Sequence, residues 1–445
     1  MSERRSVWSG ALGVWLVLAG ACGEGGGSED GGADQPSDRG PDEIEAEAGD
    51  GAEAGDPAAL PLLHREDLTR LGAFRLPNGN YGDPDVSDSF AYGATGPAYH
   101  AAHGSLFLVG HDWNQWVAEV SIPEPSGAAS FDELPVASVL QDMREITEGH
   151  LAEIGAAGAP VQYGKIGGLL VVGDALIGTA YSWYDAAIEA ELSHFRSGLE
   201  LAAAGDFAGM FKVGERNPGF LAGYMAVVPE RWRALLGGPC VTGQAAVPII
   251  SRSSQGPALF AFGPAELSEA SEAAAIWLVG YPQEHPTLGD WTNTTMPNPA
   301  YNMGSTVKGV VIPDGTRSVL FFGKTGLGIP CYGLGTDDPS LAGTFDPDGV
   351  EWCYDPVTFD KGTHAYPYVA YVWAYDALDL AAASRGEVEP WDVVPYEMWE
   401  LDLPMINEAQ GVQGATWDPA RRRIFVTHMS IGDWGITAVT VLGVS

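Results

Sequence analysis

Several polar side chains follow apolar, strand-like runs at corresponding positions of this sequence, and together they could do chemistry. They are His111, Asp112, Lys324 and His428, joined by Tyr181, His364 and Tyr366. Histidine could act as a general base or a metal ligand, aspartate could orient that histidine or bind calcium, and lysine or tyrosine could stabilise a developing anion. The alternative is that these residues only complete hydrogen-bond networks at strand ends.

Two tryptophans stand beside these positions. Trp113 lies between Asp112 and Asn114, and Trp183 lies in another polar connection. Aromatic rings presented from loops next to amide and carboxyl groups suit stacking on the faces of sugars. Most of the fourteen tryptophans are instead expected to pack in the core.

An internal repeat would bring the polar residues together. Residues 96–110, 309–323 and 414–428 align without gaps, and each copy contains a strand, a turn and a second apolar strand. Residues 168–178 are a weaker copy. Equivalent positions of repeated units lie on one face of the assembly. Residues just after the second strand of each copy are therefore expected to meet at a common central surface.

The repeat predicts an all-β fold, a β-propeller. Residues 61–445, at about 40 to 55 residues a blade, give roughly seven blades, with six or eight as alternatives. Three windows with helical periodicity, 135–151, 186–201 and 229–236, are predicted as short helical insertions. The ring is expected to close by pairing residues 71–76 with residues 437–442 in one shared blade.

The first sixty residues predict export. Arg4 and Arg5 precede an apolar stretch too short for a membrane span, which is typical of a signal peptide over residues 1–21. Small residues then precede Cys22, which predicts a lipid-modified cysteine and a membrane anchor; an ordinary secretory signal would cut the same bond. Residues 22–60 are acidic and rich in Gly and Ala, so they are predicted to be a disordered tether. The expected location is the cell envelope, or the outside of the cell without the lipid.

The remaining cysteines predict one cross-link. Cys331 and Cys353 bracket a segment rich in Gly, Asp and Pro that shows no strand or helix pattern. In an exported protein this arrangement favours a disulfide. Cys240 is left over and is expected to be buried as a small apolar residue.

Composition and motifs exclude several classes of protein. The chain has 59 acidic and 22 basic residues and a net charge of −37, which argues against nucleic acid as a partner, because phosphate binding needs a basic face. The sequence has no Gly-x-Ser-x-Gly and no His-Glu-x-x-His pattern, so it supports neither an α/β-hydrolase nor a common zinc protease. His100 and His103 fall in the turn of the first hairpin. They are predicted to be turn residues, because two imidazoles alone leave a metal short of ligands.

The folded part resembles a group of uncharacterised bacterial secreted and lipoprotein β-propellers. The runs that carry the resemblance are residues 90–95, 106–112, 117–123, 362–367 and 372–376. The resemblance implies the propeller fold and export. It implies no activity, because the group has none established.

Two functions of different class fit these observations. The first is a tethered binding module that holds a carbohydrate or another small polar ligand at the central face, with Lys324, Tyr181, Tyr366, Trp113 and Trp183 as candidate ligand-binding residues. The second is a metal-assisted hydrolase or lyase of the calcium-propeller kind, with His111, Asp112, His364 and His428 as candidate catalytic residues. Calcium needs several converging carboxylates or amides, and Asp112 is the one evident candidate. Binding is therefore favoured over catalysis.

Overall fold

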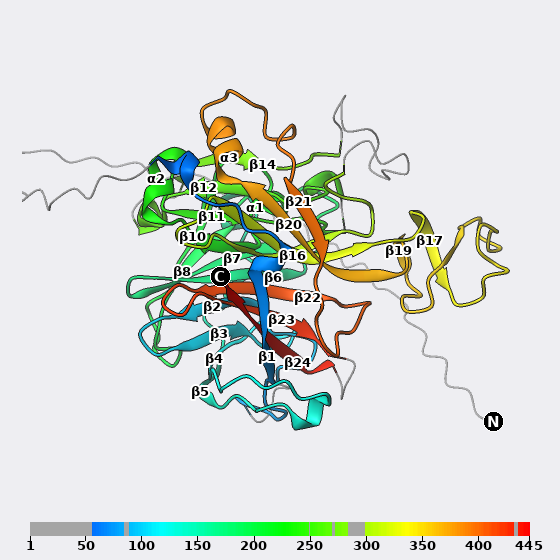
Figure 1. Ribbon diagram of the computed structural model, residues 1–445, viewed down its shortest axis with the longest axis horizontal. Helices are drawn as coiled ribbons and strands as arrows, with labels where there is room; N and C mark the ends of the chain where they lie inside the picture. The colour runs from blue at the N-terminus through cyan, green and yellow to red at the C-terminus, as the bar shows by residue number, and fades with distance from the viewer. Residues whose placement is uncertain (1–55, 84–88, 249, 269–271, 284–298, 431–434) are drawn as a thin grey trace, which may run out of the picture. The chain divides into compact units, whose positions relative to one another are not determined.

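The computed structural model describes residues 56–83, 89–248, 250–268, 272–283, 299–430 and 435–445 (Figure 1). The chain divides into two units, Met1–Ala52 and Glu53–Ser445, and the described residues belong to the second. The predicted signal peptide, Cys22 and residues 22–55 of the predicted tether lie outside the described residues. Within the described ranges, none of the helices combines the length and the apolar composition needed to span a bilayer.

Five antiparallel sheets account for most of the strands, and each runs outward from an inner strand near the axis. The first contains, from the inside outward, β2 (Thr95–His100), β3 (Ser105–Val109), β4 (Val117–Ser121) and β5 (Val139–Arg144). The second contains β6 (Gly164–Val172), β7 (Ala175–Ser182), β8 (His194–Gly198) and β9 (Ala208–Val213), with β13 (Glu272–Ala273) added in parallel to β9. The third contains β10 (Tyr224–Val227), β11 (Cys240–Gly243), β12 (Leu259–Phe262) and β14 (Ala275–Val279).

The last two sheets complete the set in the same outward order. The fourth contains β15 (Thr306–Val311), β16 (Ser318–Gly326), β20 (Tyr368–Asp376) and β21 (Glu397–Glu400). The fifth contains β22 (Val412–Asp418), β23 (Arg423–Met429), β24 (Thr437–Val444) and β1 (Leu68–Arg75). Each copy of the sequence repeat, including residues 168–178, supplies the two inner strands of one sheet, as predicted.

The inner strands form a ring. β2 contacts β6, β6 contacts β10, β10 contacts β15, β15 contacts β22, and β22 contacts β2. Glycines of the repeat permit this approach: a Cβ on Gly96 would lie 2.7 Å from the Cα of Gly168, and one on Gly309 would lie 2.4 Å from the backbone nitrogen of Ala415. The strand register also shifts at or beside these glycines, between Thr95 and Ala98 and between Val307 and Gly309. The fold is therefore a β-propeller, in agreement with the prediction.

The described residues contain five such sheets, whereas chain length predicts seven blades. The division by a typical blade length assumes short connections, and this chain has long ones. Residues between β16 and β20 form a separate sheet of β17 (Cys331–Thr336), β18 (Trp352–Tyr354) and β19 (Lys361–His364). This inserted sheet extends away from the five sheets in Figure 1.

The first and last strands close the ring. β1 pairs antiparallel with β24, from Leu68 opposite Val444 to Arg75 opposite Ala438. The predicted sharing of one blade by the two ends of the folded chain is therefore confirmed. Ahead of β1, the backbone oxygen of Ala58 accepts a hydrogen bond from Arg317. The boundary predicted at residue 60 stays a prediction.

Helices are few in the described residues. They are α1 (Pro218–Leu221), α2 (Glu230–Leu236), α3 (Ala377–Ser384) and several short 3₁₀ turns. The window 229–236 is α2, as predicted. The windows 135–151 and 186–201 contain the strands β5 and β8 instead, because pairing of β5 with β4, and of β8 with β7 and β9, overrides the local periodicity.

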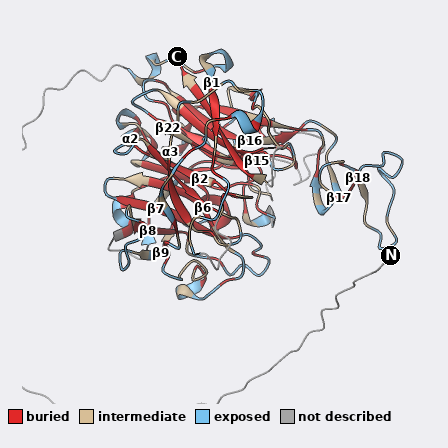
Figure 2. Ribbon diagram, turned by 90° about the horizontal axis from the view of Figure 1, so that it is seen from below, coloured by how far each residue is buried: buried red, intermediate tan, exposed pale blue. Residues whose placement is uncertain are grey.

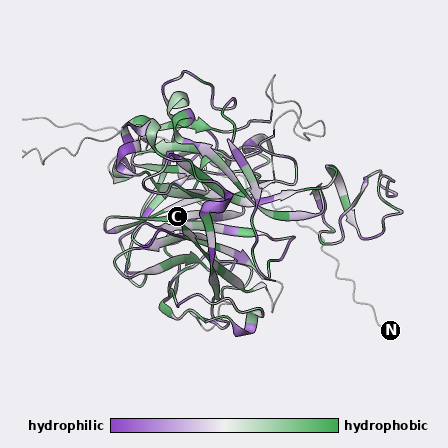
Figure 3. Ribbon diagram, viewed as in Figure 1, coloured by the Kyte–Doolittle hydropathy of each residue, from purple (hydrophilic) through white to green (hydrophobic). Residues whose placement is uncertain are grey.

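Sheet-to-sheet packing forms the core. Every residue of β3 and of β7 is buried, since both faces of these strands are covered by neighbouring sheets. One apolar cluster joins Phe107 of the first sheet to Ile166 and Leu176 of the second. Figure 2 shows buried residues along the strands, and Figure 3 shows hydrophilic residues in many of the connections.

The predicted disulfide is present. Cys331 and Cys353 are bonded, with their Cα atoms 5.8 Å apart, and Cys240 is a free, buried thiol. The segment between the bonded cysteines is more regular than predicted, because Cys331 begins β17 and Cys353 lies in β18. Asp346 forms a turn within it by accepting the backbone N–H groups of Asp348 and Val350.

Candidate functional site

A cavity of about 720 Å³ surrounds the axis where the inner strands begin. Each of the five inner strands contributes to its lining through a residue near its first position: Thr95, Gly164, Tyr224, Thr306 and Gln413. The cavity is thus the central depression that the repeat predicts, and every blade helps to form it.

Three lysines line this cavity. The whole chain has five lysines, and Lys165 of β6, Lys308 of β15 and Lys324 of β16 meet here. Asp112 is the one carboxylate among the described lining residues, and no arginine is among them. A protein with a net charge of −37 therefore places a locally positive surface at its axis.

Lys165 and Asp112 form an ion pair. The Lys165 Nζ lies 2.7 Å from Asp112 Oδ2 and also donates to the Asp112 backbone oxygen at 2.6 Å. Gln115 holds the same loop, because its Nε2 donates to the Asp112 backbone oxygen and its Oε1 accepts the N–H of Ile166. The charge of Asp112 is thus offset by Lys165, and neither of the other two lysines forms an ion pair with a described residue.

Lys308 has no hydrogen-bonding or ion-pairing partner within the described ranges. Its burial lowers the pKa; the charge of Asp112 opposes that shift and the charge of Lys165 adds to it. The Lys308 side chain is only partly buried and lines the cavity, so an anion in the cavity could reach its ammonium group.

Lys324 is held more firmly. Its Nζ donates to the backbone oxygen of Ala409 and lies 4.7 Å from the centre of the Tyr368 ring. Burial lowers the pKa of Lys324 to about 8; the charge of Asp355 opposes this shift and that of Lys308 adds to it. Lys324 is therefore a cation at neutral pH that loses its charge in mildly alkaline solution.

Aromatic rings form the rim. Tyr92, Trp113, Tyr163 and Trp183 line the cavity and are each about half exposed or more, with Trp113 at 85%. Tyr92 and Tyr163, together with Gln115, have positive φ angles of 54°, 59° and 59°. Bulky residues rarely adopt this conformation, and it concentrates where function demands a particular side-chain direction.

The structure brings five of the sequence-predicted residues into this cavity: Asp112, Lys324, Tyr181, Trp113 and Trp183. Tyr181 lies deep, and burial raises the pKa of its hydroxyl; the charge of Asp112 adds to that shift. His111 is adjacent but is not a lining residue. Its Nδ1 accepts the N–H of Trp113, and its ring lies 6.1 Å from that of Tyr92.

His428 lies elsewhere. β23 continues to Met429, so His428 is inside the strand rather than after it, and its Nε2 lies 2.9 Å from Oγ1 of Thr440 on β24. Its burial lowers the pKa of the imidazole to about 4. A fully buried imidazole between strands cannot reach a ligand in the cavity.

His364 and Tyr366 also lie away from the cavity, because residues 361–364 form β19 of the inserted sheet and do not enter a blade directly. The His364 Nδ1 lies 2.8 Å from Asp355 Oδ2, and the side chain is buried. The ring of Tyr366 contacts the rings of Tyr354 and Tyr368. These residues support the insertion.

Lys165, Lys308, Tyr92 and Tyr163 line the cavity without having been singled out in the sequence. A usable signal exists, because lysine is rare in this chain and both lysines stand just before a repeat copy. Lys308 directly precedes Gly309, and Lys165 stands three residues before Gly168. The donor set does not suit calcium: Asp112 is already paired, and calcium takes about six to eight oxygen ligands.

No family model matches the sequence, and no curated protein matches it. Solved structures with low similarity include a luciferin-regenerating enzyme, at 6% identity and a TM-score of 0.33, covering 82% of this chain and 94% of that one. A gluconolactonase from Xanthomonas campestris matches at 12% identity and a TM-score of 0.27, covering 84% of this chain and 98% of that one. The Cps50 (Swd1) β-propeller domain of Myceliophteria thermophila matches at 10% identity and 0.27, covering 81% and 98%. The β-propeller fold of this chain rests on its own sheets.

Proposed function

We propose that this propeller is a binding module for a small polar ligand that carries negative charge, and that an acidic carbohydrate fits the cavity best. The observation that carries the proposal is the convergence of three of the five lysines on one axial cavity. The chain as a whole is strongly acidic, so the lysines are not part of a general basic face.

Electrostatics favours an anion at this position. Lys308 has no protein partner among the described residues, and Lys324 has only a backbone oxygen and a ring. A ligand carboxylate or sulfate could form charge-assisted hydrogen bonds with both ammonium groups. The ammonium group of lysine is a compact point charge, so the anion does not have to be planar or to accept two parallel hydrogen bonds from one side chain.

The rim favours a sugar. Exposed rings of Tyr92, Trp113, Tyr163 and Trp183 surround the opening, and sugar faces stack on such rings. Gln244 and Gln413 add amide groups that can orient hydroxyls. A volume of about 720 Å³ falls within the range of about 300 to 1,000 Å³ found for ligand pockets.

The test is calorimetric titration of the purified chain with oligosaccharides that contain uronic acid and with neutral oligosaccharides of equal length. The acidic sugars should bind, and their affinity should fall with added salt. Lys308→Gln should remove the preference. Lys212→Gln is the matched control, because Lys212 lies on β9 beside Glu215 and Glu272, away from the cavity. Equal affinity for neutral and acidic sugars would contradict the proposal.

Catalysis is the alternative, and one observation favours it. A lysine with a pKa of about 8 is close to the range in which a side chain can accept and return protons near neutrality. The same sugars should therefore be analysed for cleavage products after incubation. Turnover that disappears in Lys324→Gln would replace the binding module with an enzyme.

We also propose that the protein is an exported lipoprotein, anchored through Cys22, with the acidic segment holding the propeller off the membrane. The support is the sequence of residues 1–60. Mass spectrometry of the mature N-terminus tests it: a diacylglycerol-modified Cys22 is expected, and Cys22→Ser should release the protein from membranes. An unmodified mature N-terminus would leave an ordinary secreted protein.

A further inference from the structure

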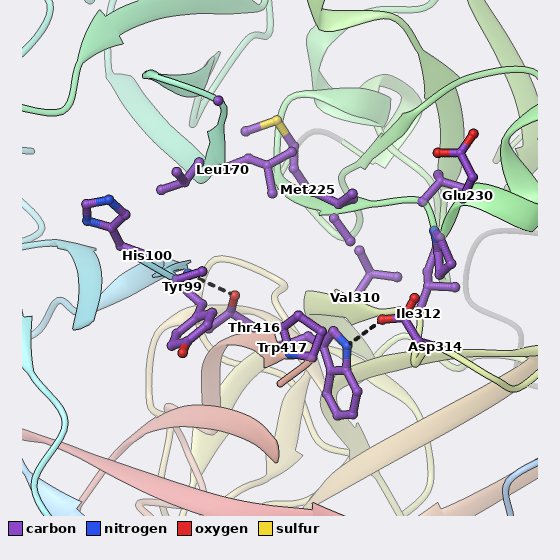
Figure 4. Close-up of a pocket in the computed structure, with 18 of the residues that line it drawn as sticks. Tyr99, His100, Leu170, Met225, Glu230, Val310, Ile312, Asp314, Thr416 and Trp417 are labelled. Carbon is purple, nitrogen blue, oxygen red and sulfur yellow. Dashed lines mark hydrogen bonds between the residues drawn. The ribbon is translucent and has the colours of Figure 1, made fainter. Parts of the chain in front are cut away.

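The opposite ends of the inner strands border a second cavity, of about 620 Å³ (Figure 4). His100, the last residue of β2, lies at its edge, and its ring is turned away from Thr416 and Trp417. That ring faces into its own sheet, toward β4. A cluster of three potential metal ligands forms there: His100, His103 and Glu119.

The register of the first sheet assembles this cluster. β2 ends at His100, the turn carries His103, and β3 begins at Ser105, which pairs with His100. Glu119 stands in the otherwise mostly apolar strand β4, and its neighbour on β5 is Gln141. The carboxylate is buried, with its side chain 1% exposed, while His103 is 53% exposed. The cluster therefore has a buried side and a side open to solvent.

The donor atoms converge on one point. The Nδ1 atoms of His100 and His103 each lie 3.0 Å from the same oxygen, Oε1 of Glu119. The two imidazole rings are 4.2 Å apart, and one ligand atom from each residue falls within 4.8 Å of the others. Two histidines and a carboxylate are a ligand set that zinc uses when it keeps a fourth position open.

The distances suit a small metal ion. Zinc bonds of about 2.0 to 2.2 Å place tetrahedral ligand atoms about 3.3 to 3.6 Å apart. Both present separations of 3.0 Å would widen by about 0.3 to 0.6 Å. The half-exposed His103 can supply its share by a small rotation, whereas His100 and Glu119 would need a small shift of buried side chains.

Neighbouring groups already hold the carboxylate. The Ser105 hydroxyl donates to Oε1 at 2.5 Å, and the Gln141 Nε2 donates to Oε2 at 2.7 Å. Gln141 is itself fixed, because its Oε1 accepts the N–H of Leu201. Such partners orient metal-ligating carboxylates and raise affinity. Ser105 and Gln141 therefore orient the buried carboxylate whether or not an ion is bound.

We propose that His100, His103 and Glu119 bind a divalent transition metal of the zinc class, with the two Nδ1 atoms and a Glu119 oxygen as ligands and water in the fourth position on the side of His103. The site is independent of the lysine cavity. The sequence predicted that His100 and His103 are turn residues, because two imidazoles are too few ligands for a metal. In the structure Glu119 on β4 supplies the third ligand.

Titration of the purified, metal-stripped full chain with Zn²⁺ tests the site. One tightly bound ion per chain is expected, and Co²⁺ in its place should give the strong visible absorption of a four- or five-coordinate ion. His103→Ala and Glu119→Gln should each weaken binding by at least about 100-fold, since even outer partners of metal ligands contribute about 10- to 100-fold.

The matched control is His150→Ala. His150 also places its Nδ1 against a glutamate, 2.6 Å from Glu153 Oε2, but this exposed pair has no third ligand among the described residues. Its loss should leave Zn²⁺ affinity unchanged. Circular dichroism of each variant shows that the fold is retained. Zn²⁺ affinity that is equal in the parent chain, His103→Ala and Glu119→Gln would overturn the proposal and leave the cluster as a hydrogen-bonded support for the first hairpin.

Discussion

The two proposed sites bring their side chains together in different ways. The lysine cavity draws Lys165, Lys308 and Lys324 from the second and fourth sheets, so it exists only when the ring is closed. The cluster of His100, His103 and Glu119 spans twenty residues of one sheet, so hairpin register alone assembles it. The comparison separates a site made by tertiary closure from one made by local strand pairing, and the two should respond independently to substitution.

The largest expected effect is a change in the free energy of unfolding with pH. It comes from His428, a buried histidine that contacts the hydroxyl of Thr440, whereas His100 contacts the carboxylate of Glu119. Burial lowers the pKa of His428 to about 4 against 6.5 for a free imidazole. Between pH 6.5 and 4 the unfolded chain binds this proton and the folded chain does not, so the free energy of unfolding should fall by about 3 kcal/mol as pH falls through that range. Chemical denaturation of the parent and of His428→Gln at several pH values measures it.

The variant should lose that part of the pH dependence, while His150→Gln, at an exposed site, should keep it. Parallel curves for the parent and His428→Gln would show that the imidazole is charged in the fold. His194 should also lower the free energy of unfolding as pH falls, because burial lowers its pKa to about 3. Its Nε2 lies 3.2 Å from the hydroxyl oxygen of Thr242.

A reciprocal pair of substitutions tests the independence of the two sites. Lys308→Gln should weaken binding of an acidic sugar by about 30-fold, because a hydrogen bond to a charged group contributes about 2 kcal/mol. The same variant should bind Zn²⁺ normally. His103→Ala should show the opposite pattern. Calorimetry of both variants with both ligands completes the test, and a variant that loses both ligands would mean that the sites are coupled.

The pH dependence of sugar binding should sharpen the assignment of Lys324. Its pKa of about 8 means that the charge is lost as pH rises through 8, so affinity for an anion should fall by up to about tenfold per pH unit above that point. Lys324→Arg stays charged and should hold its affinity to higher pH. If the parent chain and Lys324→Arg showed the same dependence of sugar affinity on pH, the titration would belong to another group, and Lys308 would be the next candidate.

The smallest effect is expected at the rim. Trp113→Ala should weaken sugar binding by about fivefold, which corresponds to about 1 kcal/mol for one stacked ring. Phe345→Ala is the control, because Phe345 is an exposed ring in the inserted segment between β17 and β18. An unchanged affinity in Trp113→Ala would remove this ring from the contact surface.

Local pattern predicted much of the fold. The gapless repeat identified the inner strand pairs of the first, fourth and fifth sheets and its weaker copy that of the second, whereas β10 and β11 of the third sheet match no copy. The two terminal strands were correctly assigned to one sheet, because both are readable as short apolar runs. The number of blades was not readable. A count based on length cannot recognise that residues 331–364 form a sheet of their own, whose strands are rich in Gly and exposed aromatic residues.

The site residues were also predicted only in part, because a local pattern shows where a strand ends but not which residues of other strands lie opposite it. Asp112 follows β3, while Lys324 and Tyr181 lie within the last three residues of β16 and β7, and all three line the cavity. In the last copy Met429 lines the cavity, whereas His428, one residue earlier, faces β24. Glu119 gave no signal, since its role depends on which residues of β3 and β5 stand opposite it. Register of this kind is fixed by packing across three strands and is invisible in a single strand.

The pairing of β1 with β24 has a consequence for how the protein is made. Residues 68–75 are among the first of the propeller to leave the ribosome, and the strand that completes their sheet is among the last. The ring therefore cannot close before β24 has been synthesised. If the chain is exported as proposed, it could cross the membrane with the ring open and close it on the far side.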